Sequence, residues 1–497
     1  MKVVFVNPPK WPGTRPVDRV YGCTYALYPI PNIFALGYAA VLENEGHEVR
    51  FIDAPNQGVT PERFKDILIK NPADIYSFHS VNLSQDIDLR CRNFIQTIQP
   101  NARFIFTGPA ATDRPDEFLI DGNTFVTRGE PDLIIKELVK VLAEGTQESD
   151  LKKVRGVSFK AGGKNWHNTT AGEIENLDDL PFPARHLVKS GVYHNPKLPK
   201  EPMTAMITSR QCAFQCIFCV PNSLGFAREI EHKRFSINSE LQEGNLPVGY
   251  GNFIKPVVKK RSAENIIEEF KLLKKQGYKS VSIVDDQFLW EEERTIKICE
   301  GIKDLGFQWG CLARADRVTE KAIKAMAKAG CRYIDLGIES LNPKTLAYIN
   351  KNATVEKMNE GMRILTESGI KLKVNMLIGS NPDETKEEIW DSIRKVIAFK
   401  PEIIMFSIVS PFPGTKYYEI AKKEGYLNGG EYHPTSVQHH AITSYKNFTS
   451  KDLDRLLWQA NAAFYFRPDV IARNLWRLFH PRSAYAALAA FKEKIIR

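Results

Sequence analysis

The segment SRQCAFQCIFC, residues 209–219, places Cys212, Cys216 and Cys219 close together, directly after an apolar run typical of a strand. Three thiolates at this spacing can wrap one iron–sulfur cubane and bind three of its four irons, which leaves the fourth iron without a protein ligand. A zinc site would need a fourth Cys or His at short spacing, and the nearest candidate, His232, is poorly placed. The spacing therefore predicts a 4Fe-4S cluster.

The cysteine segment opens a series of alternating strand and helix patterns. The helix is clearest at 262–276, where Ser262 is a good N-cap and an apolar stripe follows. Six such βα units predict a partial (β/α)6 barrel of the TIM type, whose functional residues lie at the carboxyl ends of the strands. The predicted strands are 204–208, 280–285, 307–312, 332–338, 372–378 and 403–409.

The first part of the chain shows the same alternation and predicts a doubly wound parallel sheet of the Rossmann-like kind. Its predicted strands are 3–6, 49–52, 75–78, 104–106 and 125–126, with a helix at 31–45. Such a sheet binds its ligand at the carboxyl ends of its strands. The loops at those ends are Asn7-Pro8-Pro9, 78–85, 107–112 and 128–130.

The chain is therefore predicted to be an α/β protein with four parts. Residues 1–145 form the Rossmann-like domain and residues 201–425 form the barrel. Residues 146–200 are polar and rich in proline, and they predict a small hairpin at Gly162-Gly163 followed by a linker. Residues 426–497 predict a basic C-terminal helical domain.

The composition is that of an ordinary globular protein, with 43% hydrophobic and 26% charged residues and a net charge of +9. This charge is too diffuse to indicate nucleic-acid binding. Neither a signal peptide nor an apolar stretch of about 18 residues is evident. The protein is therefore expected in the cytoplasm, where thiols stay reduced. The other cysteines are isolated and most are expected to be buried thiols: Cys23, Cys91, Cys299, Cys311 and Cys331.

The cysteine segment resembles the Cys-x3-Cys-x2-Cys motif of the radical S-adenosylmethionine (SAM) superfamily, and Phe218 matches the aromatic residue that packs near the adenine in that family. The motifs that continue the resemblance are 261–265, 284–288, 311–316, 329–331, 337–340, 379–385 and 411–415. Together they resemble the subfamily with an N-terminal cobalamin-binding domain. This resemblance implies that SAM chelates the open iron and is cleaved to a 5′-deoxyadenosyl radical by one electron, which a reductant such as flavodoxin or ferredoxin supplies.

The resemblance also implies a set of SAM-binding residues. Asp285 and Asp286 end the second barrel strand, where the family places acceptors for the methionine amino group; the alternative is that Asp285 caps the next helix. Glu339 ends the fourth strand and is similar to the residue that holds the ribose or the amino group. Arg314 could bind the methionine carboxylate as a bidentate fork, or it could pair with Asp316. The segment 379–385 departs from the family's Gly-x-Pro-Gly-Glu-Thr, which puts the local turn in doubt.

In the N-terminal domain the resemblance assigns two loops to cobalamin. Residues 107–112 and 128–130 look like loops that normally read Gly-Gly-Pro-His-Ala-Thr and Gly-Glu-x-Glu, with Thr107 and Ala110 as departures. The predicted cobalamin-binding residues are Asn7, Pro8, Gly108, Pro109, Gly129 and Glu130. The Asp-x-His-x-x-Gly motif that supplies an axial histidine elsewhere is absent, and His79 is expected to line the cleft.

Two cofactors imply the reaction: a methyl transfer to an unactivated carbon, or to phosphinate phosphorus, of a small-molecule or lipid substrate. A radical cyclase or C–C bond-forming enzyme is the alternative, and a regulatory or electron-transfer protein is a further one that the complete SAM motifs disfavour. No catalytic side chain is assigned. The basic helices of 451–497 are expected to pack over the barrel, with contact to a membrane surface as the alternative.

Overall fold

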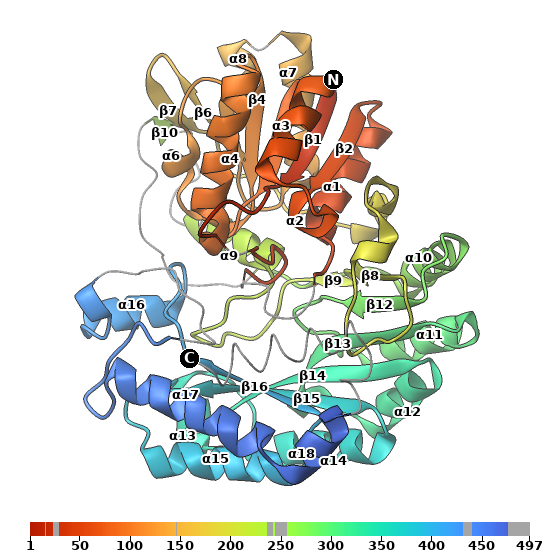
Figure 1. The fold of residues 1–497 in the computed structure, drawn as a ribbon, viewed down its shortest axis with the longest axis vertical. Helices are drawn as coiled ribbons and strands as arrows, with labels where there is room; N and C mark the ends of the chain where they lie inside the picture. The colour runs from red at the N-terminus through yellow and green to blue at the C-terminus, as the bar shows by residue number, and fades with distance from the viewer. Residues whose placement is uncertain are drawn as a thin grey trace.

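The structure is a computed structural model of the chain, and it describes residues 1–14, 16–22, 29–145, 147–235, 242–243, 256–430 and 440–475. Two sheets dominate it, one built by the first part of the chain and one by the second (Figure 1). The predicted α/β class is confirmed. Of the cysteines, Cys23 lies outside the described residues.

Five parallel strands, all predicted, form the centre of the N-terminal sheet: β1 (Lys2–Asn7), β2 (Glu48–Asp53), β3 (Ile75–His79), β4 (Arg103–Thr107) and β5 (Thr124–Thr127). Their order is β5-β4-β3-β1-β2, so the winding direction reverses at β1. This is a doubly wound arrangement. The predicted hairpin is present as β6 (Val157–Ala161) and β7 (Lys164–His167), and it extends the same sheet with antiparallel strands. The short β10 (Gln242–Glu243) pairs with β7.

Helices cover both faces of this sheet, because successive residues of a strand point to opposite sides. Val3 and Phe5 of β1 pack in the core beneath α1 (Ile33–Asn44) and α7 (Pro131–Glu144), whereas Val4 and Val6 pack beneath α3 (Pro61–Lys70) and α4 (Gln85–Ile98). The shorter helices here are α2 (Ala54–Gln57), η1 (Asn82–Ser84), α5 (Pro109–Asp113), α6 (Pro115–Phe118) and α8 (Glu148–Leu151).

The second sheet is the predicted partial barrel, with six parallel strands in chain order: β8 (Met203–Met206), β12 (Ser280–Ile283), β13 (Gln308–Arg314), β14 (Cys331–Glu339), β15 (Lys371–Ile378) and β16 (Ile403–Ile408). The helices between them are α10 (Ala263–Lys275), α11 (Glu292–Ile302), α12 (Glu320–Lys328), α13 (Pro343–Tyr348), α14 (Val355–Ser368) and α15 (Lys386–Ala398), with η5 (Lys303–Leu305) and η6 (Ala315–Arg317). Ser262 caps α10 as predicted, since its side chain accepts from the Asn265 backbone N–H.

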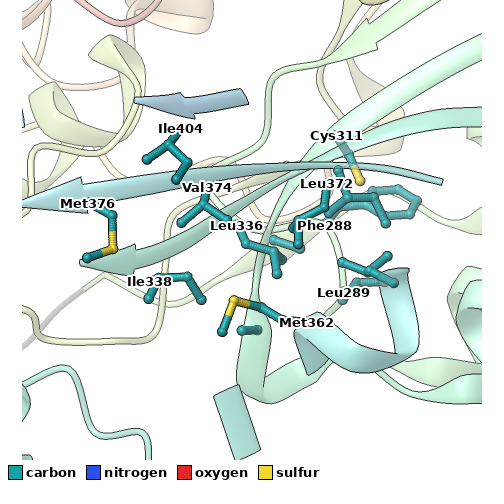
Figure 2. Close-up of a cluster of buried hydrophobic side chains, with 14 of the residues drawn as sticks. Phe288, Leu289, Cys311, Leu336, Ile338, Met362, Leu372, Val374, Met376 and Ile404 are labelled. Atoms are coloured by element: carbon teal, nitrogen blue, oxygen red, sulfur yellow. The ribbon is translucent and has the colours of Figure 1, made fainter. Parts of the chain in front are cut away.

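The alternation along each barrel strand separates a helix-facing core from a lumen. Leu336 and Ile338 of β14 pack with Val374 of β15 and Met362 of α14 (Figure 2). The alternate residues of β14, such as Asp335 and Gly337, face the other side of the sheet because the side-chain period of a strand is two. That side is the lumen of the barrel, and its carboxyl end is where the predicted site residues emerge.

The linker and the loops after β8 join the two sheets. The linker contains η2 (Leu177–Asp179), η3 (Arg185–Leu187) and η4 (Ser190–Val192). After β8 come the paired β9 (Ser209–Arg210) and β11 (Lys259–Lys260), and α9 (Ser223–Phe235), which lies between the two sheets (Figure 1). The carboxyl ends of both sets of strands therefore meet at one interface.

The C-terminal part consists of α16 (Lys416–Lys423), η7 (Asn428–Gly430), α17 (Ser450–Tyr465) and α18 (Pro468–Leu475). Helix α17 packs on β15 and β16 through Leu453, Leu457 and Phe464, while Trp458 is exposed. This supports the packing alternative for residues 450–465; residues 476–497, on which the membrane alternative also depends, lie outside the described residues. Within the described ranges, no helix is long and apolar enough to cross a membrane.

Candidate active site at the carboxyl ends of the barrel strands

The cysteine loop leaves the barrel directly after β9. Gln211, which precedes Cys212, has a φ of 80°, a left-handed conformation that non-glycine residues rarely adopt and that concentrates at functional sites. Cys212 is buried, whereas Cys216 and Cys219 are partly exposed, and none of the described cysteines forms a disulfide. Phe218 is half-buried and packs against the barrel core.

The loop that joins α13 to α14 holds the cysteine loop from one side. The Ile217 backbone N–H donates to the Ile349 carbonyl (3.0 Å), and Asn350 Nδ2 donates to the Gln215 carbonyl (2.8 Å). Asn350 and Asn352 both have positive φ angles, 53° and 50°. Three segments distant in sequence therefore meet here, because the Tyr417 N–H also donates to the Ile217 carbonyl (2.9 Å).

The donor set fits an iron–sulfur cubane better than a single ion. Among the residues that the structure describes, no three His, Cys, Asp or Glu side chains are placed to hold one metal ion. A cubane does not require three side chains that converge on one ion, since each of the three thiolates binds a different iron of the cluster. Cys212, Cys216 and Cys219 as cluster ligands remain a prediction that the loop geometry fits.

Arg314, at the end of β13, reaches over the cysteine loop. Its guanidinium forms a bidentate pair with Asp316 (2.9 and 3.2 Å), donates to the Lys351 carbonyl (2.7 Å) and stacks on the Phe214 ring at 3.6 Å. Its Nη1 lies 3.9 Å from Cys216 Sγ. The structure shows the pair with Asp316, and binding of the methionine carboxylate by Arg314 stays a prediction. The guanidinium also places positive charge where thiolates are expected.

Glu339 ends β14 with a φ of 66°, at a register shift between β14 and β15. Its Oε1 accepts from Lys351 Nζ at 3.1 Å, and both side chains are nearly buried. Burial lowers the pKa of Lys351, but the Glu339 carboxylate and the Cys216 thiol outweigh this and leave it raised. Lys351 therefore stays charged beside the cysteine loop. It is the ionic partner that the nearly buried carboxylate of Glu339 requires.

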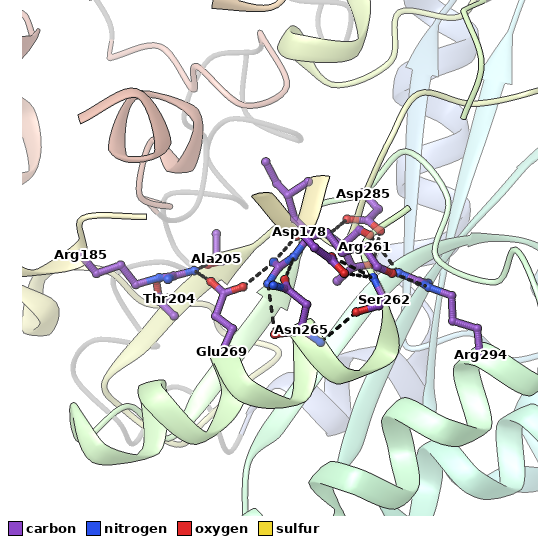
Figure 3. Close-up of polar contacts among 12 residues, drawn as sticks. Asp178, Arg185, Thr204, Ala205, Arg261, Ser262, Asn265, Glu269, Asp285 and Arg294 are labelled. Carbon is purple, nitrogen blue, oxygen red and sulfur yellow. Dashed lines mark hydrogen bonds and ion pairs between the residues drawn. The ribbon is translucent and has the colours of Figure 1, made fainter. Parts of the chain in front are cut away.

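Asp285 holds the two residues that lead into the cysteine loop, and Figure 3 shows its side chain in a polar cluster with Arg261 and Arg294. Its carboxylate accepts from the Thr208 backbone N–H (2.6 Å), the Thr208 hydroxyl (2.5 Å) and the Ser209 hydroxyl (2.7 Å). Burial raises its pKa despite these bonds. On the other side, Arg294 Nη2 donates to the Thr208 carbonyl (2.9 Å), so this residue is fixed from two directions.

The helix-cap alternative for Asp285 is wrong, because α11 begins after Glu291. Asp286 instead contacts the chain beyond the cysteines, where its Oδ1 accepts from the Asn222 N–H at 2.6 Å. The turn in doubt was that of residues 379–385. Gly379 follows β15 with a φ of 71°, and Thr385 caps α15 in a capping box. The departure from the family sequence therefore leaves strand β15 and helix α15 intact.

A small cavity of about 20 Å³ lies beside the end of β1, where the N-terminal sheet reverses its winding. Its lining includes Asn7, Pro8, Arg19 and Asp53. Asn7 Nδ2 donates to Asp53 Oδ1 (3.1 Å), and the hydroxyl of Tyr193 from the linker donates to Asp53 Oδ2 (2.6 Å). A cavity of this volume holds about one water molecule and is far smaller than the pockets that hold drug-sized ligands. As the chain is arranged it does not admit a corrin, and Asn7 and Pro8 as cobalamin-binding residues stay a prediction.

The other half of this edge is covered by α9. A Cβ atom on Gly108 would lie 2.6 Å from the Ser80 carbonyl oxygen, and one on Gly129 would lie 3.2 Å from the Glu231 Cβ of α9. Both glycines are therefore required by contacts within the protein. Pro109 begins α5, which packs on α9. Glu130 forms ion pairs with Arg210 and Arg228. As the chain is arranged, this half leaves no room for a corrin, and these four residues as cobalamin ligands stay a prediction.

Arg210 joins the two domains immediately before the cysteines. Its guanidinium forms a bidentate pair with Asp132 (2.9 and 3.1 Å) and a further pair with Glu130, all within buried surroundings. Burial raises the pKa of Glu130, but Arg210 and Arg228 outweigh it and hold that pKa below its usual value. Sequence reasoning missed Arg210, Asp132, Lys351 and Phe214; for Arg210, its place beside Cys212 was the available signal.

His79, expected to line the cleft, is buried between the domains. Its Nδ1 lies 3.1 Å from Thr107 Oγ1 and its Nε2 lies 2.8 Å from Ser223 Oγ at the start of α9. Burial, with a smaller effect of Arg19, lowers its pKa from 6.5 to about 3. Both ring nitrogens are therefore engaged by hydroxyls, and the ring is neutral across the physiological range.

This neutral ring predicts a measurable pH dependence of stability. The pKa is depressed on folding, so the contribution is complete above pH 6.5 and is lost as the pH falls from 6.5 towards 3. Between pH 7.5 and pH 5, His79→Gln should therefore lose about 2 kcal/mol less free energy of unfolding than wild type. Urea denaturation followed by circular dichroism at both pH values measures this. The exposed-histidine variant His186→Gln should behave like wild type, and equal losses in His79→Gln and wild type would refute the assignment.

Comparison with known proteins places this site in a family. Residues 206–396 match the family model described as the radical SAM superfamily, a span that contains all three cysteines, Asp285, Arg314 and Glu339. The barrel of this chain is therefore a radical SAM domain. The barrel and the cysteine loop are thus those of a radical SAM enzyme, with a 4Fe-4S cluster and SAM as its cofactors.

Similarity extends over nearly the whole chain. An uncharacterized methyltransferase of Pyrococcus horikoshii is 29% identical over 487 residues, which cover 96% of this chain and 95% of that protein. The anaerobic magnesium-protoporphyrin IX monomethyl ester cyclase of Cereibacter sphaeroides is 22% identical over 434 residues, or 84% of this chain and 63% of the cyclase. The solved structure of the cobalamin-dependent S-adenosylmethionine radical enzyme OxsB with aqua-cobalamin bound has a TM-score of 0.65 at 17% identity, and the match covers 99% of this chain and 71% of that one. The N-terminal sheet and the barrel therefore share a common fold with OxsB.

Proposed function

We propose that the chain is a cobalamin-dependent radical SAM methyltransferase that methylates an unactivated carbon of a small-molecule or lipid substrate. The observation that carries the proposal is the meeting of two carboxyl edges: the cysteine loop at the end of the barrel strands faces the ligand-binding edge of a doubly wound sheet, and Arg210 joins them. OxsB, which shares this fold, binds cobalamin, and the relative in Pyrococcus horikoshii is called a methyltransferase.

The chain's own residues bind and orient. Cys212, Cys216 and Cys219 would hold the cluster, and Asn7 and Pro8, at and just after the end of β1, would contact cobalamin. When bound, the cluster with SAM supplies hydrogen-atom abstraction and methylcobalamin supplies a methyl group, while the protein provides position and excludes water.

In the barrel, Arg314 and Lys351 set positive charge beside the cysteine loop, and Asp285 fixes the backbone that leads into it. These contacts hold the loop in one conformation before any ligand arrives, which is the form of support that a precise site requires.

A radical cyclase or C–C bond-forming enzyme is the second candidate. The cyclase of Cereibacter sphaeroides is similar over 84% of this chain, so the fold of the chain is compatible with either outcome. The two candidates differ in whether the methyl group of SAM ends in the product.

The products of one reaction separate these candidates. The enzyme, reconstituted anaerobically with iron, sulfide and hydroxocobalamin, is given SAM, a reductant and an extract of cells that lack the gene. Methylation predicts both 5′-deoxyadenosine and S-adenosylhomocysteine, with the latter dependent on cobalamin. Deoxyadenosine alone indicates the cyclase, and neither product would refute both.

Two partners complete the proposal. The cluster needs one electron per cleavage, so a small electron carrier such as flavodoxin or ferredoxin is the proposed reductant.

A peripheral contact of the C-terminal helices with a membrane would bring the enzyme to a lipid substrate. Liposome flotation of the full chain and of a chain ending at residue 475, which keeps α17 on the barrel, tests this contact, and equal flotation of both would remove it.

A further inference from the structure

A charged group lies deep in the barrel lumen, away from the cysteine loop. Parallel pairing sets Asp335 of β14 beside Leu312 of β13 and Lys373 of β15, and Lys373 beside Ile403 of β16, so these side chains form one row across four strands. Asp335 precedes Glu339 by four residues on the same strand. At about 3.3 Å per residue, the row lies about 13 Å below the end of β14.

Two lysines share one oxygen of Asp335. Lys197 Nζ lies 2.8 Å and Lys373 Nζ lies 2.9 Å from Asp335 Oδ2. Lys197 comes from a linker turn that reaches into the lumen, where its ammonium stacks on the Tyr333 ring at 3.8 Å and Asn195 Nδ2 donates to the Tyr333 hydroxyl at 3.2 Å. The linker thus closes the floor of the barrel.

This floor carries more positive than negative charge. The side chains of Lys197, Asp335 and Lys373 are only 8%, 6% and 12% exposed. Burial raises the pKa of Asp335, but the two lysines outweigh it and leave the pKa lowered, so the carboxylate is charged. One carboxylate can neutralise one ammonium, and a buried excess charge is costly unless an ion of opposite sign compensates it.

Two other ion pairs lie nearer the carboxyl end of the barrel strands. Glu339 pairs with Lys351, and Arg314 pairs with Asp316, so each of these pairs is neutral by itself. In addition, Asp335 Oδ1 is buried and accepts no hydrogen bond from any described residue. Buried polar atoms nearly always have partners, so Oδ1 requires a donor such as a water molecule, while the excess positive charge of the floor requires an anion.

The walls above the floor are mixed, and part of their surface is apolar and accessible. The next row towards the carboxyl end contains Arg314, Gly337, Asn375 and Met405, and Leu377 follows on β15. The Arg314 guanidinium is directed to Asp316 and the cysteine loop. Leu312, Met405 and Leu377 are half-buried on the lumen side of the sheet, so their apolar surface is partly accessible there. A cationic floor beneath such surface suits a molecule with an anionic end and an apolar body.

We propose that the floor formed by Lys197, Asp335 and Lys373 binds a carboxylate at one end of an apolar substrate, with Lys373 as its direct hydrogen-bond donor. This inference rests on the proposed function and adds the substrate class: an amphipathic carboxylic acid whose length, measured from the floor, selects the carbon presented near Glu339 at the top of the lumen. Lys197 and Asp335 act as positioning residues for Lys373.

Binding of simple probes tests the site without knowledge of the substrate. Octanoate has the carboxylate and the apolar chain, whereas 1-octanol has the same chain without the charge. Isothermal titration of the full chain should show octanoate binding to wild type, with at least about tenfold weaker binding of 1-octanol, since a charge-assisted hydrogen bond is roughly twice as strong as a neutral one.

Two lysine variants on one strand localise the binding. Lys373→Gln should weaken octanoate binding about tenfold or more, and it should fold because Lys197 and Asp335 remain a neutral pair. Lys371→Gln removes an exposed lysine of the same strand, 50% exposed and paired with Glu402, and should bind as wild type. Lys373→Arg should restore most of the affinity.

The outcomes are separable from the proposed function. Equal octanoate affinity in Lys373→Gln and wild type, or no binding to wild type, would overturn the floor site. Reductive cleavage of SAM without substrate should be the same in Lys373→Gln and wild type, because Lys373 is remote from the cysteine loop. Loss of that cleavage in wild type would instead refute the proposed function and leave the binding result standing.

Discussion

Replacing Cys216 with alanine is expected to abolish both the 4Fe-4S cluster and the reductive cleavage of SAM, which should fall to the rate without enzyme. Cys216 is partly exposed in the loop after β9, with Arg314 at 3.9 Å and Lys351 nearby, so it is placed for thiolate chemistry. Two thiolates cannot hold three irons of a cubane. Iron and sulfide content, electron paramagnetic resonance of the reduced protein and 5′-deoxyadenosine formation measure the effect.

A matched control comes from the barrel core. Burial raises the pKa of Cys299 to about 12, and it raises the pKa values of Cys311 and Cys331 well above the usual range, so these thiols are inert. Cys299→Ala should therefore keep wild-type iron content and SAM cleavage. A Cys216→Ala protein with four irons and wild-type cleavage would remove the cysteine loop from the chemistry.

The second large effect is expected at the domain interface. Arg210→Met should lower the free energy of unfolding by about 3–5 kcal/mol, because it leaves the buried carboxylates of Asp132 and Glu130 without their shared partner. Arg228 approaches Glu130 only to 3.5 Å and does not reach Asp132. Urea denaturation at pH 7.5 measures the loss, with circular dichroism of the folded state as a check.

A compensated variant separates the buried charge from lost packing. Arg210→Met combined with Glu130→Gln and Asp132→Asn removes all three charges and should recover most of the lost stability, because neutral groups are far less costly to bury. If Arg210→Met alone is as stable as wild type, the interface is not held by this ion pair. If the compensated variant is no more stable than Arg210→Met, the loss comes from packing.

Local sequence pattern was sufficient for most of the fold. Short apolar runs marked the strands because parallel strands covered by helices on both faces are buried along their length. Ser262 marked the start of α10 because its hydroxyl satisfies a backbone N–H there. The hairpin at Gly162-Gly163 was also local, but pattern alone did not show that β6 would pair with β5 and extend the N-terminal sheet.

The site was only partly accessible to the same reasoning. The three cysteines, Arg314 and Glu339 stood in recognisable motifs, and the structure brings them to one end of the barrel. Lys351, however, lies in a short connection between α13 and α14 with no motif of its own. Its role depends on contacts with Glu339 and with the cysteine loop that form only in the folded barrel.

The interface residues show the same limit. Glu130 was assigned to cobalamin from a loop motif, whereas its partner in the structure is Arg210, 80 residues away in sequence. For Asp285 the helix-cap alternative is wrong and the SAM role stays a prediction, while its carboxylate accepts hydrogen bonds from Thr208 and Ser209. Local pattern cannot reveal such pairs, because they depend on which strand ends the fold places together.

The fate of the methyl group of SAM tests the central claim most directly. The reconstituted enzyme is incubated anaerobically with SAM that carries a trideuteromethyl group, a reductant, hydroxocobalamin and an extract of cells lacking the gene, and the extract is then searched by mass spectrometry. The account predicts a metabolite that gains the intact trideuteromethyl group only when both cobalamin and Cys216 are present. A product that forms from the same extract with Cys216 intact but carries no deuterium would contradict the assignment as a methyltransferase.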